Sequence, residues 1–353
     1  MSLDGQEKLD RQSAFWKREA QERPVIGFTG TYFSTGVTRS LQRATGRVQP
    51  EDIVVDRVLE DCDRQFELWK DCTGDLFWTA SPLYQFRWLA AAVGAPVFVG
   101  GDSIWAEPFI KDYAMLESIL ISEENPWVRK LWDLTDALVS HAAGRYPVAA
   151  NEFMPPLSAL ADLRGNTEFA FDLYDRPVDV ARGMMRFTET WSTLISAQYE
   201  RLPAWHGGYT GAQRYIWAPG RTAEFNEDPV FMFSPRFHHE FVLPSHRRVI
   251  RQIEYAYIHL HSTQLHTLDQ VLELDELRAI EITPDHGVSI RDLLPTIAKV
   301  QAHKPVIVHA FFSAEEIKMM VETLSPDGLC IIGRAETAED ARRLQDAIMG
   351  CAG

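Results

Sequence analysis

The sequence has few cysteines and lacks long apolar runs. Its four cysteines, Cys62, Cys72, Cys330 and Cys351, form no CxxC pair, which excludes a disulfide framework and favours a reduced intracellular protein. No run approaches the roughly 18 apolar residues of a membrane span. The first residues are polar and charged, so we expect no signal segment and a cytoplasmic location.

Positive charge is also scarce. Lysine and arginine together number 35 against 50 acidic residues, which gives a formal net charge of −15. Such a surface repels phosphate backbones and anionic lipids, so we expect neither nucleic acid nor a membrane as a partner. A ligand with many carboxylates would need a local arginine or lysine cluster to overcome this field. A small-molecule substrate is the expected partner.

Glycine-rich nucleotide motifs are missing as well. Neither GxGxxG nor GxxxxGK[ST] follows a predicted strand, which removes the main nucleotide-binding signatures. What the chain does have is apolar and aromatic residues, at 46% and 11%, enough for a large buried core.

Short apolar strands alternate with helices through most of the chain. Counted from residue 75, the pattern predicts eight strands, which begin near residues 75, 146, 204, 222, 256, 278, 305 and 329. This alternation is typical of a parallel sheet covered by helices, and eight strands favour a closed (β/α)8 TIM barrel over an open sheet. We therefore expect a single α/β domain, with the barrel over 51–353. Residues 1–50, including a short strand at 24–30, are expected to form an N-terminal cap.

Three of the predicted strands carry polar side chains on one face. Alternate strand residues point to opposite sides, and the apolar set should pack on the helices. The other set then points into the barrel, near the carboxyl ends of the strands, where barrel active sites form. This inward set comprises Glu224 and Asn226, His259 and His261, and Glu281 and Asp285. His309 ends a further strand, and Arg334 lies near the end of the last one.

Buried charges and imidazoles are costly unless they are paired or functional. The inward set therefore predicts either an active site or a hydrogen-bonded structural network. His259 and His261 project to one side and can ligate a metal, with Glu224, Asp285 or His309 as the third ligand. The alternative is that the histidines donate hydrogen bonds to substrate or to carboxylate partners. Arg334 either holds a substrate carboxylate or pairs with Glu336.

Several segments resemble the uroporphyrinogen decarboxylase superfamily. They read SPRFHHEFVLP (234–244), YAYIHLHS (255–262), LHTLDQVLELDELRAIEITPD (265–285), MPPLSALADLRG (154–165) and FDLYDRP (171–177). The resemblance covers roughly residues 50–348. It implies a TIM barrel, usually a homodimer. The superfamily contains decarboxylases and zinc-dependent methyltransferases that use corrinoid or thiol acceptors.

The sequence departs from both characterised branches. The decarboxylases have an N-terminal arginine pair, which is missing from RPVIGFTGTYF (23–33), and a catalytic aspartate on the first barrel strand, where Asp75 stands only at the start. The methyltransferases have an HxC motif and a later cysteine. Here the motif is His259-Leu260-His261, and Gly333-Arg334 follows on the last strand. The resemblance thus leaves either a zinc, manganese or iron site built from histidine and carboxylate, or no metal.

Three functions are compatible with these observations. The first is an enzyme for methyl transfer or demethylation of a small polar substrate, in which His259 and His261 hold a metal, and Glu224, Asp285 or His309 is catalytic. Asn226, Glu281 and Arg334 would bind substrate, and a corrinoid protein is a possible methyl partner. The second is a decarboxylase in which a cationic histidine or Arg334 stabilises developing negative charge. The third is a catalytically inactive barrel that serves as a binding subunit.

Overall fold

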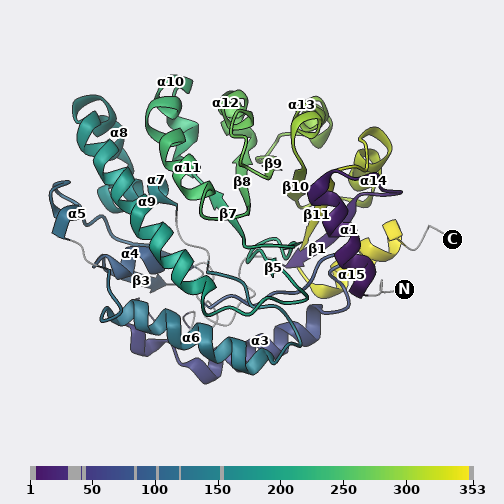
Figure 1. Cartoon of the computed structure of the whole chain (residues 1–353), viewed down its shortest axis with the longest axis horizontal. Coiled ribbons are helices and arrows are strands. Elements are labelled where there is room, and N and C mark those ends of the chain that lie inside the picture. The colour runs from purple at the N-terminus through teal and green to yellow at the C-terminus, as the bar shows by residue number, and fades with distance from the viewer. Residues whose placement is uncertain are drawn as a thin grey trace.

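The computed structural model describes residues 5–30, 41, 45–82, 86–100, 103–118, 121–151 and 155–349. Its centre is a curved sheet of six parallel strands in the order β1-β11-β10-β9-β8-β7 (Figure 1). The strand bounds are β1 Val25–Gly30, β7 Thr222–Asn226, β8 Tyr255–His261, β9 Ala279–Thr283, β10 Val306–Ala310 and β11 Leu329–Ala335. This order confirms the α/β class and a parallel sheet.

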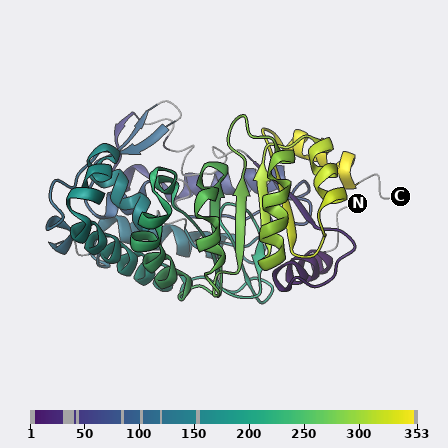
Figure 2. The ribbon, with the colours of Figure 1, turned by 90° about the horizontal axis from the view of Figure 1, so that it is seen from above.

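Helices follow the strands of this sheet and cover its outer face (Figures 1 and 2). On this side lie α10 Pro235–Phe237, α11 Leu243–Ile250, α12 Leu268–Leu272, α13 Ile290–His303, α14 Ala314–Thr323 and α15 Ala338–Met349. The remaining helices are α1 Gly5–Lys17, α3 Val55–Trp69, α4 Trp88–Ala92, α5 Met115–Ser118, α6 Pro126–Ala142, α7 Pro156–Arg164, α8 Asn166–Asp175 and α9 Pro177–Tyr199. Among the described residues, no helix is long and apolar enough to cross a membrane.

The strands differ from the expected set in three places. The strand at 24–30 pairs with β11 and belongs to the main sheet, not to a separate cap. The predicted strands at 75 and 146 are reduced to one parallel bridge between Ala80 and Val148, and residues 152–154 lie outside the described part of the chain. Six parallel strands are thus present as regular elements of the main sheet.

The predicted strand at 204–211 is broken by a turn, and only two of its residues form a strand. His206 and Gly207 both have positive φ, at 48° and 78°, and Trp205 and Gly208 pair across them. Two successive left-handed residues make a tight hairpin turn, so this segment folds back on itself and cannot continue as a barrel strand. It leads into a short hairpin of β5 Tyr209–Thr210 and β6 Trp217–Ala218. A separate antiparallel sheet contains β2 Gly46–Arg47, β3 Val97–Gly100 and β4 Ser103–Ala106.

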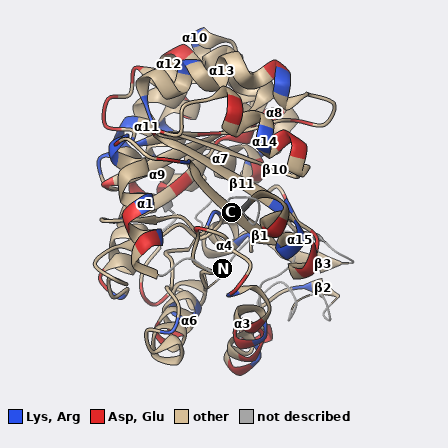
Figure 3. Cartoon of the chain, turned by 90° about the vertical axis from the view of Figure 1, so that its right-hand side faces the viewer, with Lys and Arg blue, Asp and Glu red and all other residues tan. Residues whose placement is uncertain are grey.

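The hydrophobic core lies on both sides of the main sheet. The residues of β10 and β11 are almost all apolar and buried, as expected for parallel strands covered on both faces. Charged residues lie mainly on the surrounding helices (Figure 3). Within the main sheet, the titratable side chains of His259, Glu281 and His309 are buried.

Helix α1 lies against the amino ends of the strands. The Arg18 guanidinium donates to the carbonyls of Gln301 and His303, just before β10. The backbone amide of Gln21 donates to Asp327, just before β11. These polar contacts hold the start of the chain at the amino ends of the strands. His259 and His261 lie at the opposite, carboxyl end.

Candidate functional site

The carboxyl ends of β7, β8 and β9 bring the predicted polar residues together. The parallel register aligns Asn226 with His259 and His259 with Glu281. The rings of His259 and His261 meet edge to face with centroids 4.7 Å apart. The strand alternation therefore assigned both histidines to the correct face.

Beneath these strand ends is a buried charge cluster: Arg214, Glu224, His259, Glu281 and His309. The Arg214 Nε donates to Glu281 Oε2 at 2.7 Å, and its Nη2 lies 3.3 Å from Glu224 Oε1. His259 Nδ1 lies 2.9 Å from Glu281 Oε1, and His309 Nδ1 lies 3.5 Å from the same oxygen. One carboxylate thus faces an arginine and two imidazoles.

This cluster keeps Glu281 ionised. Burial alone would raise the pKa of Glu281, but the Arg214 and His259 side chains hold it well below its usual range. Burial, reinforced by the Arg214 charge, lowers the pKa of His309 to about 3, so this imidazole is neutral at pH 7. The cluster is therefore a carboxylate paired with an arginine, flanked by a neutral histidine.

Above the cluster lies an outer pair, His261 and Asp285, which is about one-third exposed. His261 Nδ1 is 2.8 Å from Asp285 Oδ1, and its Nε2 is 3.8 Å from Asp228 Oδ1. The Ser262 hydroxyl and the Thr263 backbone amide donate to Asp285 Oδ2. Although burial opposes them, these donors lower the pKa of Asp285, which keeps it an acceptor for His261.

The two histidines and Asp228 are suited to a divalent metal. Possible ligand atoms of Asp228, His259 and His261 all lie within 4.8 Å of one another, as do those of Glu224, His259 and Glu281. The carboxylates of Glu281 and Asp285 occupy Nδ1 of His259 and His261, which leaves the Nε2 atoms for coordination. Ligating histidines in metal sites are usually held in this way by a carboxylate. The donor set fits zinc, manganese or iron and contains no thiolate.

The predicted residues outside this set have other surroundings. Asn226 accepts the backbone amide of Asp228 at 3.2 Å and shapes the turn after β7. The Arg334 guanidinium stacks on the Phe311 ring at 4.5 Å. Glu281, predicted to bind substrate, is fully buried, and its oxygens face Arg214, His259 and the Thr283 hydroxyl. Asp285, a predicted third ligand, holds His261 in place instead.

Three important residues were missed in the sequence. Arg214 lies in the β5–β6 hairpin, where no hydrophobic periodicity distinguishes inward from outward residues. Its importance becomes apparent only in the structure, where it is a buried charge that needs a partner. Asp228 lies two residues beyond the end of β7. It continues the alternate positions of Glu224 and Asn226, so the same alternation, carried past the strand, would have predicted it. Glu227 is buried against the start of α7 and accepts the amides of Leu157 and Ser158. Burial raises its pKa to about 8.

Comparison with known proteins gives similarity in structure alone. No family model matches the chain, and no curated protein sequence matches it. A methyltransferase from Methanosarcina mazei is similar in structure, with a TM-score of 0.66 and 13% identity over 97% of this chain and 98% of the other. A B12-independent methionine synthase from Shewanella, solved with selenomethionine, has a TM-score of 0.37 and 12% identity over 72% and 68% of the two chains. The first of these shows the fold of this chain.

Proposed function

We propose that the chain is an enzyme for methyl transfer or demethylation of a small polar substrate at the carboxyl ends of β7–β10. The observation that carries this proposal is the pair His259 and His261, each held at Nδ1 by a carboxylate, with Asp228 beside them. The structural likeness to a methyltransferase is an analogy of fold and supports the reaction class only in that sense.

In this proposal, His259, His261 and Asp228 hold a divalent metal. Such an ion, when bound, polarises the heteroatom from which the methyl group leaves or to which it is transferred. Glu281 and Asp285 are positioning residues that fix the two imidazole rings. Glu224 and His309 would lie next to the reacting groups, and His309, neutral at pH 7, would exchange hydrogen bonds with the substrate without changing its charge.

The methyl group leaves its heteroatom, which keeps the bonding electron pair, and forms a bond to the acceptor nucleophile. We propose a corrinoid, carried by a separate protein, as this acceptor. We also propose a homodimer, on the strength of the superfamily resemblance.

We further propose that the sheet closes into a (β/α)8 barrel through residues near 76–80 and 147–149. The amide of Asp75 donates to the carbonyl of Ile26 at 2.9 Å, and that of Ala80 donates to Pro147 at 3.1 Å. The main sheet supplies six strands, one of which is β1, and these two segments bring the total to eight.

A decarboxylase has less support from the same cluster. His309 cannot be the cationic histidine that stabilises a carbanion at pH 7, because its pKa of about 3 keeps it neutral. The Arg214 charge already faces two carboxylates. In a binding subunit without activity, the buried cluster would be a hydrogen-bonded structural network, and neither metal retention nor turnover would be expected.

Metal analysis and a methyl-transfer assay test the proposal together. We expect purified protein to retain zinc, manganese or iron near one equivalent, and His259→Ala and His261→Ala to lose it. His303→Ala, an exposed histidine at the end of α13, is the matched control and should retain the metal.

For activity, methylated amines, thiols and ethers are offered with cob(I)alamin as acceptor, and methylcobalamin is followed by absorbance. We expect turnover that requires the metal and His261. Retention of the metal in both histidine variants, or turnover unaffected by metal removal, would contradict the proposal.

A further inference from the structure

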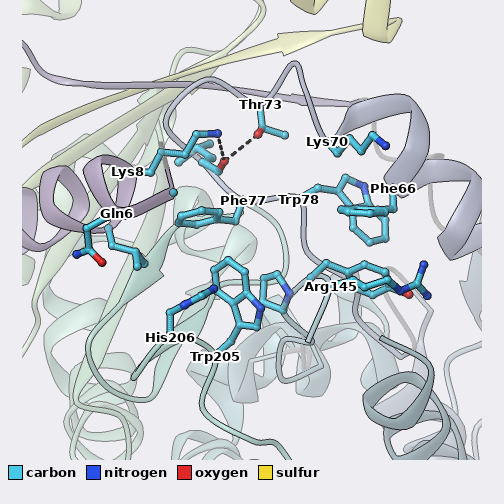
Figure 4. Close-up of a pocket in the computed structure, with 15 residues that line it drawn as sticks. Gln6, Lys8, Phe66, Lys70, Thr73, Phe77, Trp78, Arg145, Trp205 and His206 are labelled. Atoms are coloured by element: carbon cyan, nitrogen blue, oxygen red, sulfur yellow. Dashed lines mark hydrogen bonds between the residues drawn. The ribbon is translucent and has the colours of Figure 1, made fainter. Parts of the chain in front are cut away.

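A pocket lies at the opposite end of the main sheet from the candidate site. It has a volume of about 410 Å³ and is formed by α1, by residues just before the Ala80–Val148 bridge, and by the turn at Trp205 and His206. Because the residues that directly follow α1 contact the residues that precede β10 and β11, this pocket is at the amino ends of the strands. Figure 4 shows its lining.

Aromatic rings form most of the wall. Phe66, Trp78 and Tyr146 pack against one another at angles, with centroids 4.9 to 5.7 Å apart. On the other side, Phe77 meets Trp205 edge to face at 4.8 Å. Rings held in this way offer faces and edges to a flat ligand, with which offset stacking and edge contacts are favourable.

Three cations line the same pocket, and Lys8 differs from the other two. Lys70 pairs with Glu67 at 2.6 Å, and Arg145 pairs with Asp63 at 2.9 Å. Lys8 is 9% exposed, and no carboxylate oxygen in the described part of the chain lies within 4.0 Å of its Nζ. Its ammonium makes one long hydrogen bond, 3.4 Å to the Leu76 carbonyl, and lies 5.6 Å from the centre of the Phe77 ring.

A buried ammonium group without a counter-ion is costly, even in a protein with a net charge of −15. Burial lowers the pKa of Lys8, although the charges of Asp75 and Asp71 oppose this shift. An anion in the pocket would supply the missing partner, and a flat ring attached to it would cover the aromatic wall.

We propose that this pocket binds a planar aromatic carboxylate, with its carboxylate on Lys8 and its ring between Phe77 and Trp78. The site is separate from the strand ends that carry the histidines, so the proposal does not depend on the proposed methyl transfer. The volume accommodates one ring or two fused rings.

Calorimetric titration with 2-naphthoate tests this proposal. We expect saturable binding to the wild-type protein, and affinity weaker by about tenfold or more in Lys8→Met, because a charge-assisted hydrogen bond is lost. Lys17→Met is the matched control, since Lys17 lies on the same helix, is exposed and pairs with Glu19. It should bind 2-naphthoate as the wild type does.

Two further measurements separate the contribution of the ligand's charge from that of its aromatic rings. 2-Naphthamide, which has the same rings without the charge, should bind more weakly than 2-naphthoate to the wild type but equally to wild type and Lys8→Met. Phe77→Leu should weaken 2-naphthoate binding several-fold with little change in melting temperature. Absence of saturable 2-naphthoate binding at millimolar concentration, or equal affinity in Lys8→Met and wild type, would overturn the proposal.

Discussion

Two buried carboxylates, Glu281 and Asp75, face arginines at opposite ends of the sheet. At the amino end, Asp75 accepts two hydrogen bonds from Arg23, at 2.5 and 2.8 Å, and one from the backbone amide of Ile26. At the carboxyl end, Glu281 accepts from Arg214, and His259 and His309 lie against it. Both carboxylates are fully buried.

The difference lies in the partners. Those of Asp75 belong to the backbone of β1 and to the segment before it, so this pair connects the start of the chain to the sheet. The partners of Glu281 are Arg214 and two imidazoles, and the His259 ring has a second nitrogen that does not face Glu281. Similar ion pairs therefore fix the fold at one end and orient imidazole rings at the other.

Arg214→Met should have the largest effect on stability. It leaves Glu281 buried without its cation, which typically costs about 3–5 kcal/mol. Urea unfolding measures this loss. Adding Glu281→Leu should recover much of the stability without recovering metal binding, because an apolar pair needs no counter-charge. If Arg214→Met alone is as stable as the wild type, Arg214 is not needed to compensate the charge of Glu281.

Asp75→Asn should have a smaller effect. Arg23 is 27% exposed and can turn to water, so we expect about 1–3 kcal/mol, the cost of unsatisfied donors. Amide hydrogen exchange should show faster opening of α1 and β1, whereas the metal content stays that of the wild type. Loss of the metal in this variant would show that the two ends are not independent.

The pH dependence of stability should reveal Glu227, which adjoins the carboxyl end. Its folded pKa is about 8, above the usual 4.5, so the folded state holds a proton that the unfolded state releases. Its contribution to stability is complete below pH 4.5 and is lost as the pH rises to about 8, by up to about 1.4 kcal/mol per pH unit. Glu227→Gln should remove this decline. Parallel pH profiles for variant and wild type would refute the assignment.

Strand alternation was sufficient to predict much of the carboxyl end. From Ile258 to His261 and from Ile280 to Thr283, apolar and polar residues alternate, so the inward positions of His259, His261 and Glu281 follow from one rule. The roles of the individual side chains within the cluster could not be predicted from this alternation. That Glu281 and Asp285 hold the histidines depends on distances between strands, which a single sequence does not contain.

The amino half was harder to predict. Residues 204–211 contain the apolar and aromatic residues of a strand, but the backbone at His206 and Gly207 makes a turn. The strand at 24–30 was recognised, but its partner β11 lies some 300 residues away in sequence, and only the topology shows that it belongs to the sheet. Arg214 escaped for the same reason, because its partners come from distant strands.

His261→Ala should change stability least and function most. The side chain is one-third exposed and its Asp285 partner retains the donors of Ser262 and Thr263, so unfolding should shift by no more than about 1–2 kcal/mol. Metal binding and turnover should nevertheless be lost, because Nε2 of His261 is one of the three proposed ligand atoms. Asp285→Asn keeps that atom but loosens the ring, and metal affinity should fall by about 10–100-fold. If His261→Ala instead unfolds the protein, the histidine stabilises the strand end, and the contrast between the two ends of the sheet fails at this residue.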